Sequence, residues 1–86
     1  MNIYVSNLSL NIIDADLRKL FSPYGEVSSA EILRDKWNGR SKGSAYVHMA
    51  NDGQGSRAIL CLDKTVVDGK AITVSEVVYD VSDHAF

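Results

Sequence analysis

The sequence has very little cysteine and proline, with one residue of each among 86. Its single cysteine, Cys61, has no partner for an internal disulfide, so no disulfide framework of the kind found in small secreted domains is present. Long apolar runs are also missing, since none approaches the ~18 residues that a transmembrane helix needs. The first residues lack the basic and apolar segments of a signal peptide. These absences predict a cytoplasmic protein with no membrane segment.

Positive charge is scarce overall, because nine Lys and Arg against eleven Asp and Glu give a net charge of −2. Phosphate contacts supply much of the affinity of nucleic-acid-binding proteins, so this balance argues against such a partner. The distribution is uneven, however. Four of the nine basic residues lie in residues 34–42, where Asp35 is the only acid. We call residues 34–42 the basic loop, a local cationic segment in an acidic chain.

Residue patterns that carry chemistry are missing as well. No Ser-His-Asp, Cys-His or paired-carboxylate arrangement stands out, and no glycine-rich phosphate loop appears. Nothing in the spacing of His48, His84 and Cys61 indicates a metal site. We therefore expect a protein that is not an enzyme, with no catalytic residue, no metal and no cofactor.

Apolar residues recur at two periods along the chain. Alternation predicts strands over residues 2–7, 26–33, 42–49 and 72–78, the second with an irregular start. Helical spacing predicts helices over residues 14–21 and about 51–62, the second with a frayed first turn because of its glycines. We expect Asp14 to cap the first helix and Gly25 to lie close to its end. Residues 66–67 and 71–72 look like a short hairpin.

The order strand, helix, strand, strand, helix, strand predicts an α+β fold, the ferredoxin-like βαββαβ sandwich. Two helices would cover one face of a four-stranded antiparallel sheet and leave the other face open. The first and third strands are central in such a sheet, which places Tyr4 and Tyr46 side by side on the open face. Residues 1–78 would form this domain, and residues 79–86 a tail that could fold back on the sheet.

Two short segments carry a family resemblance. Residues 3–8, IYVSNL, match the hexamer RNP2, and residues 42–49, KGSAYVHM, match most positions of the octamer RNP1. Supporting matches are Asp16-Leu17, Phe21, Tyr24-Gly25, the loop before Gly43, and Asp68-Gly69-Lys70 before Ile72-Thr73-Val74. The chain thus resembles the RNA recognition motif (RRM) family over residues 3–77. It looks like the small stand-alone single-RRM proteins of some bacteria.

The resemblance implies single-stranded RNA laid across the open sheet face. Tyr4 and Tyr46 would then each stack on a base, and Lys42 would contact the phosphate between the two bases. Ser44 stands where the family usually has a third aromatic residue, so this chain lacks one ring. The other residues that we expect to bind RNA are Arg34, Lys36, Trp37 and Arg40 of the basic loop, and His48.

The two tyrosines alone would bind weakly. Stacking contributes roughly 1–3 kcal/mol per base, whereas association costs at least ~4 kcal/mol. The basic loop must supply the balance, while Glu31 and Glu76, which we expect at the open face or its edge, oppose it. We therefore expect weak to moderate affinity with a strong dependence on salt.

Each candidate residue also has a structural explanation. Tyr4 and Tyr46 could simply pair across strands, and His48 could be a polar cross-strand neighbour. Trp37 could pack its loop against the sheet, and the basic loop could be a solvated turn. The alternative function is a protein-interaction or homodimerising RRM whose sheet face is covered by a partner, a second copy or the tail. Single-stranded DNA is an open alternative to RNA, and the sequence preference is not determined.

Overall fold

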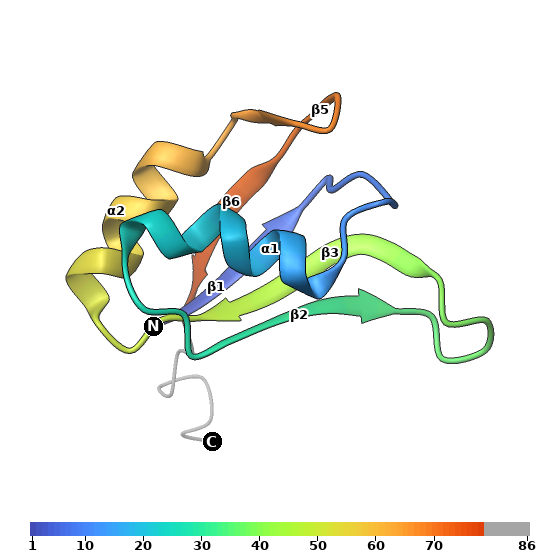
Figure 1. The fold of residues 1–86 in the computed structure, drawn as a ribbon, viewed down its shortest axis with the longest axis horizontal. Coiled ribbons are helices and arrows are strands. Elements are labelled where there is room, and N and C mark those ends of the chain that lie inside the picture. The colour runs from blue at the N-terminus through green and yellow to red at the C-terminus, as the bar shows by residue number, and fades with distance from the viewer. Residues whose placement is uncertain (79–86) are drawn as a thin grey trace, which may run out of the picture.

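The computed structural model describes residues 1–78, which form two helices and a four-stranded sheet in the predicted order (Figure 1). The elements are β1 (Asn2–Ser6), α1 (Asp14–Phe21), the 3-10 turn η1 (Ser22–Tyr24), β2 (Ser29–Arg34), β3 (Ser41–His48), α2 (Asp52–Leu62), β4 (Val66–Val67), β5 (Lys70–Ala71) and β6 (Thr73–Val77). Strands β4 and β5 pair as the predicted hairpin. The predicted folding back of residues 79–86 lies outside the described residues. No helix in residues 1–78 is long and apolar enough to cross a membrane.

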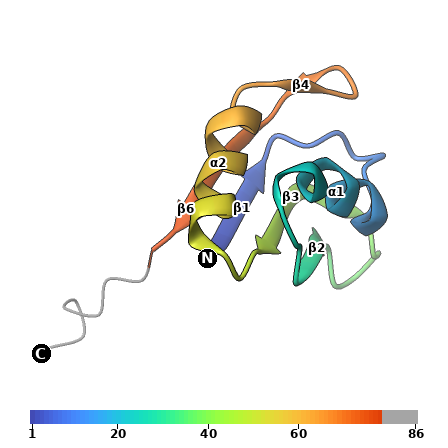
Figure 2. The ribbon, with the colours of Figure 1, turned by 60° about the vertical axis from the view of Figure 1, so that its left-hand side comes forward.

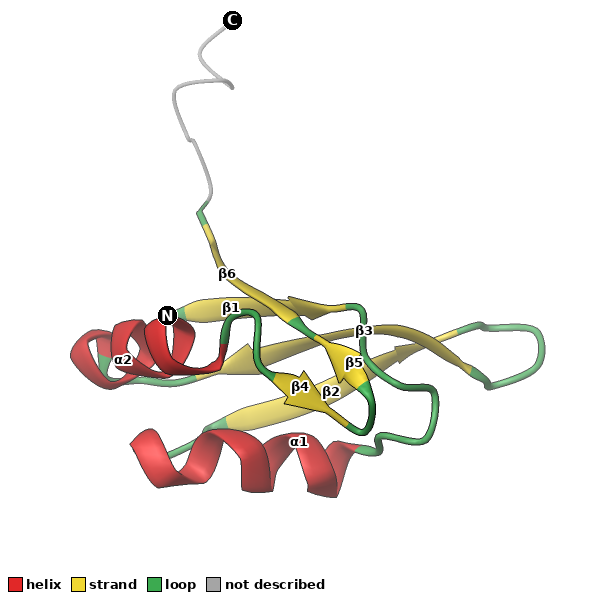
Figure 3. Cartoon of the chain, turned by 90° about the horizontal axis from the view of Figure 1, so that it is seen from above, coloured by secondary structure: helices red, strands yellow, loops and turns green. Residues whose placement is uncertain are grey.

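The sheet has the strand order β2-β3-β1-β6, and every pair in it is antiparallel. Strands β1 and β3 are therefore the central neighbours, as predicted. Figures 2 and 3 show the helices on one side of the sheet, with the opposite face left open. This is the ferredoxin-like α+β sandwich that the order of elements predicted.

The core lies between the helices and the sheet. Ile3, Val5, Ala45 and Val47 alternate along the two central strands and are almost completely buried. The helices contribute the buried side chains of Leu17, Phe21, Ala58 and Leu62. Because successive side chains of a strand point to opposite faces, the residues between these strand positions lie on the open face.

The start of helix α1 differs from the prediction. Asp14 is the first helical residue, not the cap, and its Oδ1 accepts a 2.9 Å hydrogen bond from the backbone N–H of Ile32. Ile13 precedes the helix, and its N–H donates to Oδ2 of Asp16 at 3.2 Å. Cap preferences consider only local hydrogen bonds. The Asp14 carboxylate instead bonds to strand β2 and joins the helix to the sheet.

The irregular part of strand β2 also lies elsewhere than expected. The strand begins at Ser29 instead of Glu26, although the N–H of Ser28 already donates to the carbonyl of His48 at 2.8 Å. The shift in register with β3 falls between Ile32 and Arg34, at the end of the strand. The bulge therefore lies beside the basic loop.

Gly43 lies on β3 between Ser41 and Ala45, the partners of Arg34 and Ile32 at this register shift. Its backbone is left-handed, with φ +76°. Its carbonyl accepts a 2.9 Å hydrogen bond from the N–H of Leu8, which fixes the segment after β1 against β3. A Cβ at this position would lie 3.2 Å from the carbonyl oxygen of Leu8. Both the backbone conformation and the close approach favour glycine here.

We expect Gly43→Ala to lower the free energy of unfolding by about 1–2 kcal/mol through the backbone conformation alone. The Leu8 contact adds to this, and each 1 kcal/mol lowers Tm by roughly 4–8 °C in a domain of this size. Gly39→Ala is the matched control, because Gly39 has φ +70° but no atom within 4 Å of a Cβ. Thermal melts should place Gly43→Ala below Gly39→Ala. Equal melting temperatures would show that the Leu8 contact has no effect.

Candidate nucleic-acid interface

The open face presents two rows of side chains that cross all four strands of the sheet. In the order β2, β3, β1, β6 the tyrosine row is Glu31, Tyr46, Tyr4 and Ser75, and the histidine row is Ser29, His48, Asn2 and Val77. Residues two apart on a strand are about 7 Å apart, so the rows are neighbours. Each row brings together side chains that are far apart in the sequence.

Tyr4 and Tyr46 face each other directly across strands β1 and β3. Their ring centroids are 5.4 Å apart and their planes are tilted by 50°. This is an attractive aromatic pair, so the cross-strand contact considered from the sequence exists. Tyr46 is nevertheless 46% exposed and Tyr4 is half-buried. Because of the tilt, one flat ring system cannot lie parallel to both tyrosine rings.

Strand β3 also carries Ser44, two residues before Tyr46 on the open face, and Lys42, the last residue of the basic loop. Residues at two-residue steps share a face of a strand, and the intervening Gly43 and Ala45 are buried. The Lys42 side chain is exposed and that of Ser44 is half-buried. The structure thus has an exposed cation four residues from Tyr46 on β3 and no ring at position 44.

Asp35 organises the basic loop. Its Oδ1 accepts hydrogen bonds from the N–H groups of Trp37, at 2.8 Å, and Asn38, at 3.2 Å. The Asp35 N–H donates to the carbonyl of Arg40 at 2.8 Å, and the guanidinium of Arg34 donates to the Gly39 carbonyl at 3.4 Å. The only acid in this loop therefore holds the turn together. The sequence predicted a turn here and gave Asp35 as an opposing charge at the start of the loop, but it did not predict that Asp35 holds the turn, although Asp is a typical turn residue.

Trp37 does not pack its loop against the sheet, since its side chain is 87% exposed. Figures 1 and 3 show the loop projecting beyond the paired ends of β2 and β3. The ammonium of Lys36 lies 5.7 Å from the centroid of the indole ring, within the range of a cation–π contact. The structural explanation for Trp37 is therefore wrong, and the ring is accessible at the tip of the basic loop. Arg40 is exposed in the same loop.

The two glutamates expected near the open face lie on different sides of the sheet. Glu31 pairs with Tyr46 and is exposed on the open face, as expected. Glu76 pairs with Ile3, which is completely buried on the helix side, so of the two expected positions, the open face or its edge, Glu76 takes the edge. The side chain of Glu76 is exposed because β6 is an edge strand, although it lies on the helix side of the sheet. Only Glu31 places a negative charge beside the tyrosines.

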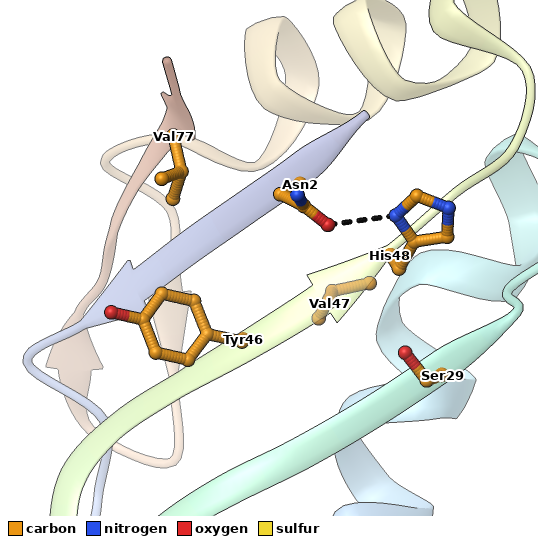
Figure 4. A pocket seen from close by; sticks show the side chains of 6 residues that line it. All are labelled: Asn2, Ser29, Tyr46, Val47, His48 and Val77. Atoms are coloured by element: carbon orange, nitrogen blue, oxygen red, sulfur yellow. Dashed lines mark hydrogen bonds between the residues drawn. The ribbon is translucent and has the colours of Figure 1, made fainter. Parts of the chain in front are cut away.

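A shallow hollow of about 270 Å³ lies at the histidine row, lined by Asn2, Ser29, Tyr46, Val47, His48 and Val77 (Figure 4). Nδ1 of His48 and Oδ1 of Asn2 are hydrogen-bonded at 2.7 Å. His48 is therefore a polar cross-strand neighbour, as considered above, and also part of the wall of a cavity. Sequence reasoning missed Asn2, Ser29 and Val77. Extending the two-residue period backwards from Tyr4 would have placed Asn2 on the open face.

This arrangement agrees with comparisons to known proteins. Residues 3–73 match the RNA recognition motif family. The chain belongs to this family. The alignment with RbpD of Nostoc sp. extends over 76 residues at 40% identity. These residues are 88% of this chain and 81% of that protein. The 31 kDa ribonucleoprotein of Nicotiana sylvestris chloroplasts is 44% identical over 73 residues, which are 85% of this chain but 23% of that protein.

Solved structures of RRM proteins superimpose closely on this one. The crystal structure of RNA-binding protein PG1 has a TM-score of 0.89 and 36% identity, over 93% of this chain and 96% of that one. A complex of the Sxl-lethal protein with RNA has a TM-score of 0.83 and 33% identity, over 88% of this chain and 47% of that one. The RRM expected from the two motifs is therefore confirmed, and so is its fold.

Proposed function

We propose that this RRM binds single-stranded RNA across the open face of its sheet, with Tyr4 and Tyr46 each stacking on one base. The observation that carries the proposal is the pair itself, two rings on adjacent central strands with centroids 5.4 Å apart. Aromatic residues at these motif positions are the stacking residues of RRMs that bind RNA. The similar structure of the Sxl-lethal protein is a complex with RNA, which supports RNA as the ligand.

The phosphate contacts come from the basic loop, which includes Lys42. Lys42 is exposed on β3, four residues before Tyr46, and Arg34, Lys36 and Arg40 precede it in the same basic loop. The exposed Trp37 supplies one further stacking surface at the loop tip. Ser44 leaves the usual third ring absent, so charge carries more of the affinity. Binding in this scheme requires no catalytic residue, and a cytoplasmic location remains a prediction.

Fluorescence anisotropy with labelled octamers of rA, rC and rU, and of the matching DNA, tests the proposal. We expect at least one RNA octamer to bind at low salt and to bind less tightly as salt is added. Sedimentation of the free protein tests the alternative, in which a second copy covers the open face. No binding to any octamer, together with a dimer that Tyr46→Ala dissociates, would replace RNA binding with homodimerisation.

Neutralising Glu31 is expected to strengthen RNA binding by about twofold at low salt. Its carboxylate faces the tyrosine row, and two charges about 10 Å apart in water interact by roughly 0.4 kcal/mol. Glu76→Gln is the matched control, because it removes the same charge from the helix side of the sheet. Anisotropy titrations should show a gain for Glu31→Gln and a smaller one for Glu76→Gln. Equal gains would mean that only net charge matters.

A further inference from the structure

The open face does carry a third ring, in the row next to the tyrosines and on the side away from Ser44. His48 lies two residues beyond Tyr46 on β3 and on the same face. We propose that the histidine row is a third nucleobase site, in which the imidazole of His48 is the stacking ring. This inference rests on the RNA-binding function proposed above. It places a third ring on β3 on the opposite side of Tyr46 from Ser44, where the family's third aromatic is missing.

The hollow at the histidine row has the size and lining of a site for one base. Its volume of about 270 Å³ is just below the roughly 300–1,000 Å³ of pockets for larger ligands. Val77 adds an apolar wall, and the ring of Tyr46 borders both the hollow and the tyrosine row (Figure 4). A strand that stacks on Tyr46 can therefore place its neighbouring base directly in the hollow.

The hydrogen bond between His48 and Asn2 holds the imidazole in place. An amide oxygen can only accept, so Nδ1 of His48 carries the proton in this 2.7 Å contact. A ring that is already fixed loses less conformational freedom when a base stacks on it. The amide NH₂ of Asn2 and the hydroxyl of Ser29 bring hydrogen-bonding groups to the edge of the hollow, where they can meet a base.

The charge distribution along β3 separates this site from the phosphate contacts. The histidine row contains no Lys, Arg, Asp or Glu, whereas Lys42 and the basic loop adjoin the opposite end of the strand. Among residues 1–78, the nearest acid on the open face is Glu31, in the tyrosine row. A site with rings, amide and hydroxyl groups but no cation suits a base, not a phosphate.

Two substitutions at His48 separate stacking from the cross-strand hydrogen bond. His48→Phe keeps a ring and loses the bond to Asn2, while His48→Gln can keep a hydrogen bond and loses the ring. With the RNA octamer that binds best among rA, rC and rU, His48→Gln should weaken binding by about 5- to 150-fold. His48→Phe should stay within about threefold of the native protein. Thermal melts of both variants verify that each is folded.

The native protein supplies an independent measurement. On adding the same octamer, the NMR amide signals of Ser29 and Val77 should shift together with that of Tyr46. The third site is wrong if His48→Gln binds like the native protein and these two signals stay in place while Tyr46→Ala abolishes binding. In that case the proposed function stands. If the native protein binds no octamer, the proposed function fails, and the third site fails with it.

Discussion

Replacing Tyr46 with alanine is expected to weaken binding of the best RNA octamer by roughly 5- to 150-fold, the loss of one base stack. Tyr46 is 46% exposed, so its removal leaves the core intact and the folded state populated. Tyr4→Ala should cause a similar loss of affinity with a larger fall in Tm, because Tyr4 is half-buried. Anisotropy titrations and thermal melts on the same samples measure the two effects.

Tyr46→Phe is the control for the stacking role. It keeps the ring and the aromatic contact at 5.4 Å, so affinity should remain within about threefold of the native value. The structural explanation of the pair makes the opposite prediction. If the rings only stabilise the sheet, Tyr46→Ala lowers Tm and leaves the affinity for RNA unchanged. The comparison of Tm with Kd therefore decides between the two roles.

Local periodicity was enough to predict the face on which the tyrosines lie. Ile3 and Val5 alternate with Tyr4, and Ala45 and Val47 alternate with Tyr46, so one choice of buried side fixes the open side. The pairing of β1 with β3 followed from the order of elements and not from any local signal. The fold and the candidate platform were predictable because local patterns give the elements and their buried faces, and the order of the elements gives the pairing of the central strands.

What sequence reasoning missed depends on contacts between distant segments. Asp14 bonds to Ile32, and His48 bonds to Asn2 across 46 positions of sequence. Neither partner can be chosen until the register of the strands is known. Glu76 shows a second limit, since the sequence left open whether it lies on the open face or at the edge of the sheet. On an edge strand, a residue on the helix side is also exposed, so polarity does not distinguish the faces there.

The salt dependence of binding should come almost entirely from the basic loop. For single strands, the logarithm of the binding constant falls with the logarithm of salt concentration with a slope of about −0.7 per phosphate contact. Contacts from Arg34, Lys36, Arg40 and Lys42 would give a slope near −2.8. Affinity would then fall by about 50-fold between 50 and 200 mM salt.

Replacing these four residues by glutamine should bring the slope close to zero and remove most of the affinity at low salt. The chain offers a control matched in charge, because Lys19, Arg57, Lys64 and Lys70 are exposed outside the loop and the two rows. Either quadruple variant takes the net charge from −2 to −6, since each removes four positive charges. If only net charge attracts the RNA, both variants lose affinity and slope equally. If the loop holds phosphates, the control variant keeps most of the slope, and Lys42→Gln alone reduces it by about 0.7.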